Sequence, residues 1–180
     1  VVHAGRSRRV TLYGTGPDFA RALTMRVASG DYLPPDDPHA ARAFVVLGSK
    51  VARELFGTDN PLGSRIRVGS ERYRVVGVME SKGQILGFDL DDTVYIPVGS
   101  AMKLLNRSEV DEVDIRAASP EAIDPVAARI KAHGFPMVLN VPVVRQNIDQ
   151  VERILRVTSA MGADFYDAGT QPVKTSPLVA

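Results

Sequence analysis

Alternating apolar and polar positions in the middle of the chain predict a β-hairpin. Residues 65–68 read Arg, Ile, Arg, Val and residues 72–75 read Arg, Tyr, Arg, Val, with Gly, Ser and Glu between them. Because successive side chains of a strand point to opposite faces, the apolar residues of both arms share one buried face. The outward positions all carry the same residue type and form the candidate interaction surface: Arg65, Arg67, Arg72 and Arg74.

Apolar runs next to the hairpin predict the rest of a β-rich module. Phe44–Leu47 predicts a short buried strand, and Thr93–Pro97 predicts another. Gly48 and Ser49 are expected to cap a helix of one to two turns, and Gly77 to mark a β-bulge. The buried face of that helix is expected to consist of Val51, Ala52, Leu55 and Phe56.

Further helices and strands are predicted on both sides of this module. On the N-terminal side, Arg9–Gly14 predicts a strand and residues 17–25 predict a helix. On the C-terminal side, Ser100–Asn106 predicts a short helix, Val110–Ala117 a half-buried strand and residues 119–133 a longer helix. The pattern ends with an edge strand and an amphipathic helix, Met137–Val144 and Asn147–Met161.

The order of these elements predicts a mixed α/β (α+β) fold with two lobes. Residues 1–32 and 108–161 are expected to form one discontinuous α/β lobe. Residues 33–107 are expected to form an inserted β-rich lobe with one short helix, and residues 162–180 a loose tail.

Composition excludes several classes of protein. The net charge of +1 gives no basic excess of the kind that nucleic-acid binding requires. No run approaches the ~18 consecutive apolar residues of a membrane span. The chain has no Cys, which excludes disulfides, thiolate chemistry and Cys-based zinc sites. It starts at Val1 with neither an initiating Met nor a signal segment, so we expect a piece of a longer protein.

No motif predicts a catalytic, cofactor or metal site. The acidic segment 89–92 begins like a calcium loop, but Ser100 stands where the bidentate Glu would be, so a solvated turn is expected. Residues 48–50 end like a phosphate loop, but Ala43 replaces its first glycine. The histidines lack the spacing of zinc ligands: His3, His39 and His133. The sequence therefore predicts a protein that is not an enzyme and holds no cofactor.

Two interpretations of the four-arginine face stay open. The first is a solvated sheet face with no partner. The second is a docking face for an acidic partner or for an anionic lipid head group. A similar choice applies to Ile85, Leu86 and Phe88, which either cover the core or form an interaction patch.

Four segments together carry a family pattern: VVLGSKVARELFG, NPLGSRIRV, YRVVGVMESKG and DDTVYIPVGSA. In this order and spacing, from about Thr11 to about Ile154, the chain resembles the extracytoplasmic core domain of MacB-like and FtsX-type ABC transporter permeases. The resemblance implies that the α/β lobe is porter-like and that its N-terminal part is incomplete here. It also implies a periplasmic position, as a domain between the first and second membrane helices of an inner-membrane protein.

The resemblance further implies a non-catalytic domain that transmits conformational change and contacts a periplasmic adaptor or a substrate during export. The implied partners are a second permease subunit, an ABC ATPase reached through the membrane helices, and a periplasmic adaptor (membrane fusion protein). No nucleic acid and no cofactor is implied. The alternatives are a stand-alone module that binds an amphiphilic ligand between the two lobes, and a small hydrolase, which would need a convergent cluster of polar side chains.

Overall fold

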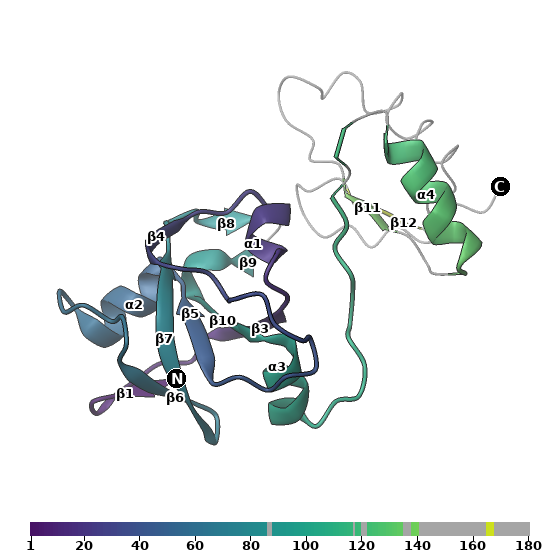
Figure 1. Ribbon diagram of the computed structural model, residues 1–180. Coiled ribbons are helices and arrows are strands. Elements are labelled where there is room, and N and C mark those ends of the chain that lie inside the picture. Colours follow the sequence, from purple (N-terminus) through teal and green to yellow (C-terminus); the bar gives the residue numbers. More distant parts are fainter. Residues whose placement is uncertain (86–87, 117, 120–121, 135–137, 141–164, 168–180) are drawn as a thin grey trace. The chain divides into compact units, whose positions relative to one another are not determined.

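A mixed β-sheet forms the centre of the first of two units in the computed structural model (Figure 1). The structure describes residues 1–85, 88–116, 118–119, 122–134, 138–140 and 165–167. The first unit comprises Val1–Gln84 and Phe88–Ile115, and the second comprises Ile85–Gly87 and Arg116–Ala180. Among the described residues, no helix combines the length and the hydropathy that crossing a bilayer requires.

Eight strands make up this sheet, in the order β2-β1-β6-β7-β5-β10-β3, with β4 also paired to β7. Their bounds are β1 Val2–His3, β2 Arg6–Ser7, β3 Thr11–Thr15, β4 Val27–Gly30, β5 Phe44–Leu47, β6 Arg65–Val68, β7 Glu71–Met79 and β10 Thr93–Pro97. The pairs β3–β10 and β5–β7 are parallel, whereas the others are antiparallel. A mixed sheet with a few helices confirms the predicted mixed α/β fold class.

Two helices pack on one face of the sheet, α2 (Ser49–Phe56) and α3 (Val98–Leu105). The buried face of α2 is the one predicted: Val51, Ala52, Leu55 and Phe56. These side chains contact inward residues of β5, β6, β7 and β10, which include Leu47, Ile66 and Val75. The main apolar core therefore lies between α2, α3 and the sheet.

Aromatic side chains fill the other face where β3 and β10 run side by side. The ring of Tyr95 lies 6.1 Å from that of Tyr13, 6.0 Å from that of Phe19 and 6.1 Å from that of Tyr32, centroid to centroid. Phe19 comes from α1 (Phe19–Ala22), and Tyr32 follows β4. Figure 1 shows the chain between β4 and β5 crossing over this part of the sheet.

The bulge predicted at Gly77 is confirmed. Val45 pairs with Val75, but the next residue, Val46, pairs with Gly77, so β7 carries one extra residue. The backbone of Asp31 lies beside Gly77, where a Cβ atom would come within 2.1 Å of the Asp31 carbonyl oxygen. A residue without a side chain is required for that close approach.

The half-buried strand predicted over Val110–Ala117 is wrong for the residues that the structure describes. Residues 110–116 form no strand, and the side chains expected to be buried are exposed, Val113 by 74% and Ile115 by 57%. Period-two alternation produces a strand only where a sheet edge accepts it and covers its apolar side. None of the described strands pairs with residues 110–116.

Several predicted helix bounds also differ. The helix predicted over residues 17–25 is short because Thr24 adopts a φ of 54°, which ends α1. Of the two residues expected to cap α2, Gly48 is the N-cap residue, whereas Ser49 is the first residue of the helix and no side chain caps that end. The helix predicted over Ser100–Asn106 begins at Val98 and ends before Asn106, whose φ of 52° closes it.

The second unit contains a helix, α4 (Ile123–Ala132), and two paired strands, β11 (Val138–Asn140) and β12 (Phe165–Asp167). The helix lies within the predicted residues 119–133, and β11 lies within the predicted edge strand. β12 lies in the segment predicted as a loose tail. The predicted helix Asn147–Met161 and the side chains of Ile85, Leu86 and Phe88 lie outside the described residues.

Strands from residues 1–32 and strands from residues 33–107 share the one sheet of the first unit. The predicted lobe made of residues 1–32 and 108–161 stays a prediction, because residues 141–161 lie outside the described part of the chain.

Candidate interaction surface

The hairpin of β6 and β7 presents the four predicted arginines on one face. In its antiparallel register Arg65 lies opposite Arg74, and Arg67 lies opposite Arg72. The intervening pair, Ile66 and Tyr73, is buried in the core, with exposed fractions of 1% and 4%. All four arginines are exposed. The predicted alternation of buried apolar residues and exposed arginines is therefore confirmed, whereas a partner for this face stays a prediction.

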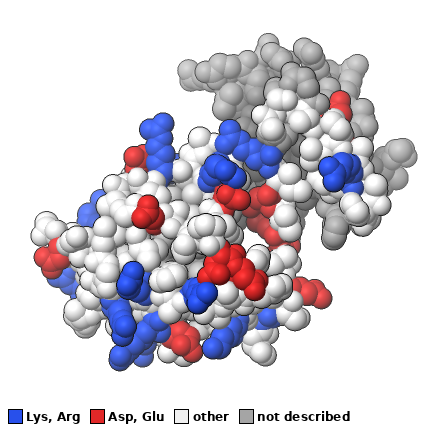
Figure 2. Space-filling view, viewed as in Figure 1, with Lys and Arg blue, Asp and Glu red and all other residues white. Residues whose placement is uncertain are grey.

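These arginines have no acidic partner among the residues that the structure describes. One aromatic contact is present, because the Arg74 guanidinium lies over the Phe44 ring, 6.0 Å from its centroid. Figure 2 shows Lys and Arg side chains gathered over the lower left of the first unit, where the β6–β7 hairpin lies. We call Arg65, Arg67, Arg72 and Arg74 the arginine face.

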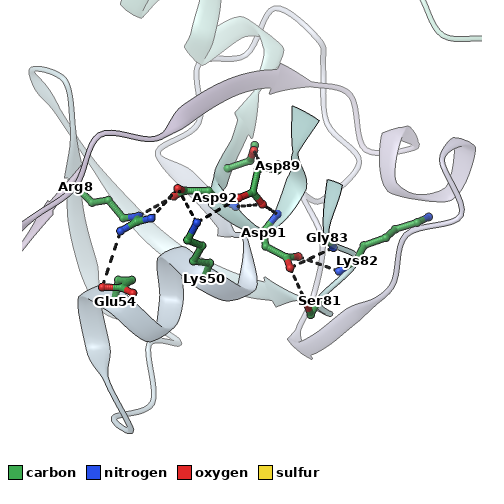
Figure 3. A network of polar contacts seen from close by, with 10 residues as sticks. Arg8, Lys50, Glu54, Ser81, Lys82, Gly83, Asp89, Asp91 and Asp92 are labelled. Carbon is green, nitrogen blue, oxygen red and sulfur yellow. Dashed lines mark hydrogen bonds and ion pairs between the residues drawn. The ribbon is translucent and has the colours of Figure 1, made fainter. Parts of the chain in front are cut away.

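A second polar constellation joins the N-terminal segment to a 3₁₀ turn, η1 (Leu90–Asp92), as Figure 3 shows. Arg8 donates from Nε to Asp92 Oδ1 at 2.7 Å and from Nη2 to Asp92 Oδ2 at 2.6 Å. Lys50, in the first turn of α2, donates to Asp89 Oδ2 at 3.3 Å and lies 3.5 Å from Asp92 Oδ2. Glu54 adds a longer contact, 3.9 Å from Arg8 Nη1. We call these five residues the polar network.

The turn that supplies these carboxylates is held by its own hydrogen bonds. Asp89 Oδ1 accepts from the backbone N–H groups of Asp91 and Asp92, as an N-cap residue does. Asp91 in turn accepts from the Ser81 hydroxyl at 2.6 Å and from the Lys82 N–H at 2.8 Å. The turn is thereby tied both to the N-terminal segment and to the chain that follows β7.

These contacts favour the charged forms of Lys50, Asp91 and Asp92. The hydrogen bond from Arg8 lowers the pKa of Asp92, and the hydrogen bond to Asp89 raises the pKa of Lys50. Burial would raise the pKa of Asp91, but hydrogen bonds from Ser81 and from backbone N–H groups outweigh it, so that pKa is lowered. A general acid or base needs a pKa near the working pH. The pKa values of Lys50, Asp91 and Asp92 are instead shifted away from neutrality, which suits groups that act as a structural clamp.

Sequence reasoning missed this network. In the sequence, Lys50 suggests only part of a phosphate loop, and the segment 89–92 only a calcium loop or a solvated turn. The structure joins both to Arg8, which is 84 residues from Asp92 along the chain. The one local signal in the sequence is the glycine at position 48. The structure explains it, because a Cβ atom there would lie 2.4 Å from the Asp91 carbonyl oxygen.

The described residues contain no cluster of three or more His, Asp or Glu side chains arranged to hold a metal ion. The hollow beside Thr15, Leu33 and Phe44 has a volume of about 40 Å³. Small-molecule sites typically occupy ~300–1,000 Å³, so this hollow in the first unit does not suit an amphiphile. The exposed arginine face is therefore the better candidate for contact with another molecule.

Comparison with known proteins agrees with the family resemblance found in the sequence. Residues 1–133 match the model of a family described as the MacB-like periplasmic core domain. A macrolide export ATP-binding/permease protein MacB of Chlorobium luteolum is 30% identical over 125 residues, which cover 69% of this chain and 19% of that protein. The chain thus spans about a fifth of the length of that relative.

Solved structures show the same fold. The periplasmic region of MacB from Actinobacillus actinomycetemcomitans superposes with a TM-score of 0.51 at 22% identity, covering 68% of this chain and 56% of that one. The extracellular domain of the noncanonic ABC-type transporter YknZ from Gram-positive bacteria gives a TM-score of 0.55 at 22% identity, covering 69% and 65%.

Proposed function

This chain belongs to the family of MacB-like periplasmic core domains, and from that premise we propose that it is a non-catalytic, conformation-transmitting domain of an ABC transporter permease. During export it contacts a periplasmic adaptor or a substrate. Its further partners are the second permease subunit and the ABC ATPase, which it reaches through the membrane helices of the full-length protein.

The observation that carries this proposal is the family match over residues 1–133, which includes the described sheet and its helices. The relative named as an ATP-binding/permease protein is about five times longer than the matched segment. We therefore assign ATP hydrolysis to a part of the full-length protein outside this chain, and partner contact to the chain itself.

The polar network supports the transmitting role. A domain that passes on movement must resist deformation between the point where force enters and the surface where it acts. Arg8 ties the N-terminal segment to Asp92 by two charge-assisted hydrogen bonds, and Lys50 ties the same turn to α2. Bidentate pairs of this kind fix geometry as well as distance. Movement of the N-terminal strands is thereby coupled to η1 and α2.

The test uses the full-length permease purified from membranes, with residues 1–133 replaced by a short Gly-Ser linker. We expect ATP hydrolysis to persist and co-purification of the membrane fusion protein to be lost. Arg53→Ala, an exposed change on α2, is the control and should leave both properties unchanged. Retention of the membrane fusion protein by the deleted permease would refute adaptor contact. Loss of ATP turnover with nucleotide still bound would refute the non-catalytic assignment.

A further inference from the structure

We propose that the arginine face binds a carboxylate-rich segment of a partner protein. This inference deepens the proposed function, because it locates the contact surface of the domain on one hairpin. It rests on the proposed function only in taking the occupant to be a protein of the export assembly.

The geometry of the face suits an extended acidic segment. Two arginines stand on each of two neighbouring strands, in directly opposed pairs, on a face without acidic partners among the described residues. Each guanidinium is planar and donates two parallel hydrogen bonds to a carboxylate. A strand-like segment with alternate acidic side chains would match this spacing, because its outward residues repeat with the same period.

The arrangement also has a cost that folding alone does not explain. Like charges directly opposite each other in an antiparallel pair destabilise a hairpin. Here both cross-strand pairs, Arg65 with Arg74 and Arg67 with Arg72, are of that kind. The chain as a whole is nearly balanced, with 22 Lys and Arg against 21 Asp and Glu. A bound acidic segment would convert the repulsion into attraction.

The same face fits a protein better than an anionic membrane surface. Ser70 lies in the turn of the hairpin and the exposed Glu71 begins β7 beside it, so the tip would bring a negative charge to a bilayer. Membrane-binding surfaces instead combine Lys and Arg with aromatic or aliphatic side chains that enter the interface. The aromatic residue at this face, Phe44, is only partly exposed and lies under the Arg74 guanidinium.

The test measures binding of a fluorescein-labelled peptide of alternating Glu and Thr to the full chain by fluorescence anisotropy. A peptide of alternating Gln and Thr is the matched probe without charge. The face variant is R65S/R67S/R72S/R74S. The control variant, R9S/R21S/R26S/R53S, removes the same charge from other exposed positions. A third variant, with Lys at all four positions of the face, keeps the charge and removes the planar fork.

We expect the face variant to lose at least about tenfold in affinity for the Glu peptide, because four exposed ion pairs are removed. The control should bind as the unchanged chain does, the Lys variant should bind at an intermediate level, and binding should weaken as salt rises. Circular dichroism verifies that each variant is folded.

Equal loss of affinity in the face and control variants would overturn the proposal, since net charge would then explain binding. So would binding to phosphatidylglycerol vesicles without binding to the peptide, or self-association of the chain that the face variant abolishes. The peptide can fail to bind while the membrane fusion protein still co-purifies with the permease. That outcome would reject this surface and leave the proposed function standing.

Discussion

Single residues of the polar network decide how firmly the N-terminal segment is held. Arg8 is the centre of this contact, because its guanidinium donates two hydrogen bonds to Asp92 and also approaches Glu54. The Arg8 and Asp92 side chains are 25% and 22% exposed, so water screens their attraction only in part. An ion pair in such a position contributes more than one on the open surface.

Replacement of Arg8 by Ala should therefore lower the free energy of unfolding by about 1–2 kcal/mol, because Asp92 loses both of its charged donors from that side chain. Urea denaturation at neutral pH measures the change. Arg9→Ala, at the neighbouring exposed position, should change stability by less than about 0.5 kcal/mol. Equal effects of the two substitutions would show that the network does not clamp the segment.

The network and the neighbouring Asp91 should also make stability depend on pH. Asp91 and Asp92 have pKa values below the ordinary 3.8 in the folded state, so below about pH 4 the unfolded chain binds more protons than the folded one. Their contribution is complete above the unfolded pKa and is lost as pH falls through the folded pKa. Asp92→Asn should thus destabilise the chain at pH 7 and lose this effect near pH 2, by urea denaturation. A difference that stays constant down to that pH would contradict the argument.

Gly48 allows the network to form, because the backbone of η1 lies against it. An added Cβ atom would come within 2.4 Å of the Asp91 carbonyl oxygen and 2.7 Å of that of Leu90. Gly48→Ala should destabilise the chain by at least about 2 kcal/mol in thermal or urea unfolding. Gly16→Ala is the control, since a Cβ atom there would meet no heavy atom within 4 Å. A harmless Gly48→Ala would mean that η1 can move away.

At the scale of elements, local pattern predicted the hairpin and α2 well. In both, the apolar residues face a core that forms within the same stretch of chain, so the period of the sequence equals the period of burial. Val110–Ala117 has an equally clear alternation, but no described strand pairs with it, and Val113 is exposed. Periodicity shows which side of a segment could be buried. Whether another element covers that side depends on the tertiary fold.

The hairpin allows a direct test of the repulsion within the arginine face. Arg72→Glu places a carboxylate opposite Arg67 and replaces a like-charge pair by an opposite-charge pair. We expect the free energy of unfolding to rise by about 0.2–1 kcal/mol, with a smaller rise for Arg72→Gln. The gain should shrink in high salt. A loss of stability in Arg72→Glu, measured by urea denaturation at low salt, would show that the four arginines do not repel one another.

At the scale of the whole molecule, the candidate sites differ in how far sequence could predict them. The arginine face comes from one hairpin, so alternation alone located it. The polar network joins Arg8, Lys50 and Asp92, which lie in three separate segments that only the folded sheet brings together. Spacing within a single motif carries no information about such a contact, and for that reason the segments of Lys50 and Asp92 each resembled only an incomplete motif.

Our central claim also concerns the whole molecule: we propose that this domain moves with the nucleotide state of the permease. The chain has no cysteine, so Arg53→Cys on the exposed side of α2 provides a unique attachment point for a spin label in it. The measurement is the distance between the two labels of the full-length dimer, freed of other cysteines, by double electron–electron resonance. We predict different distance distributions in the nucleotide-free and ATP-bound states. Identical distributions in a permease that still hydrolyses ATP would contradict the account.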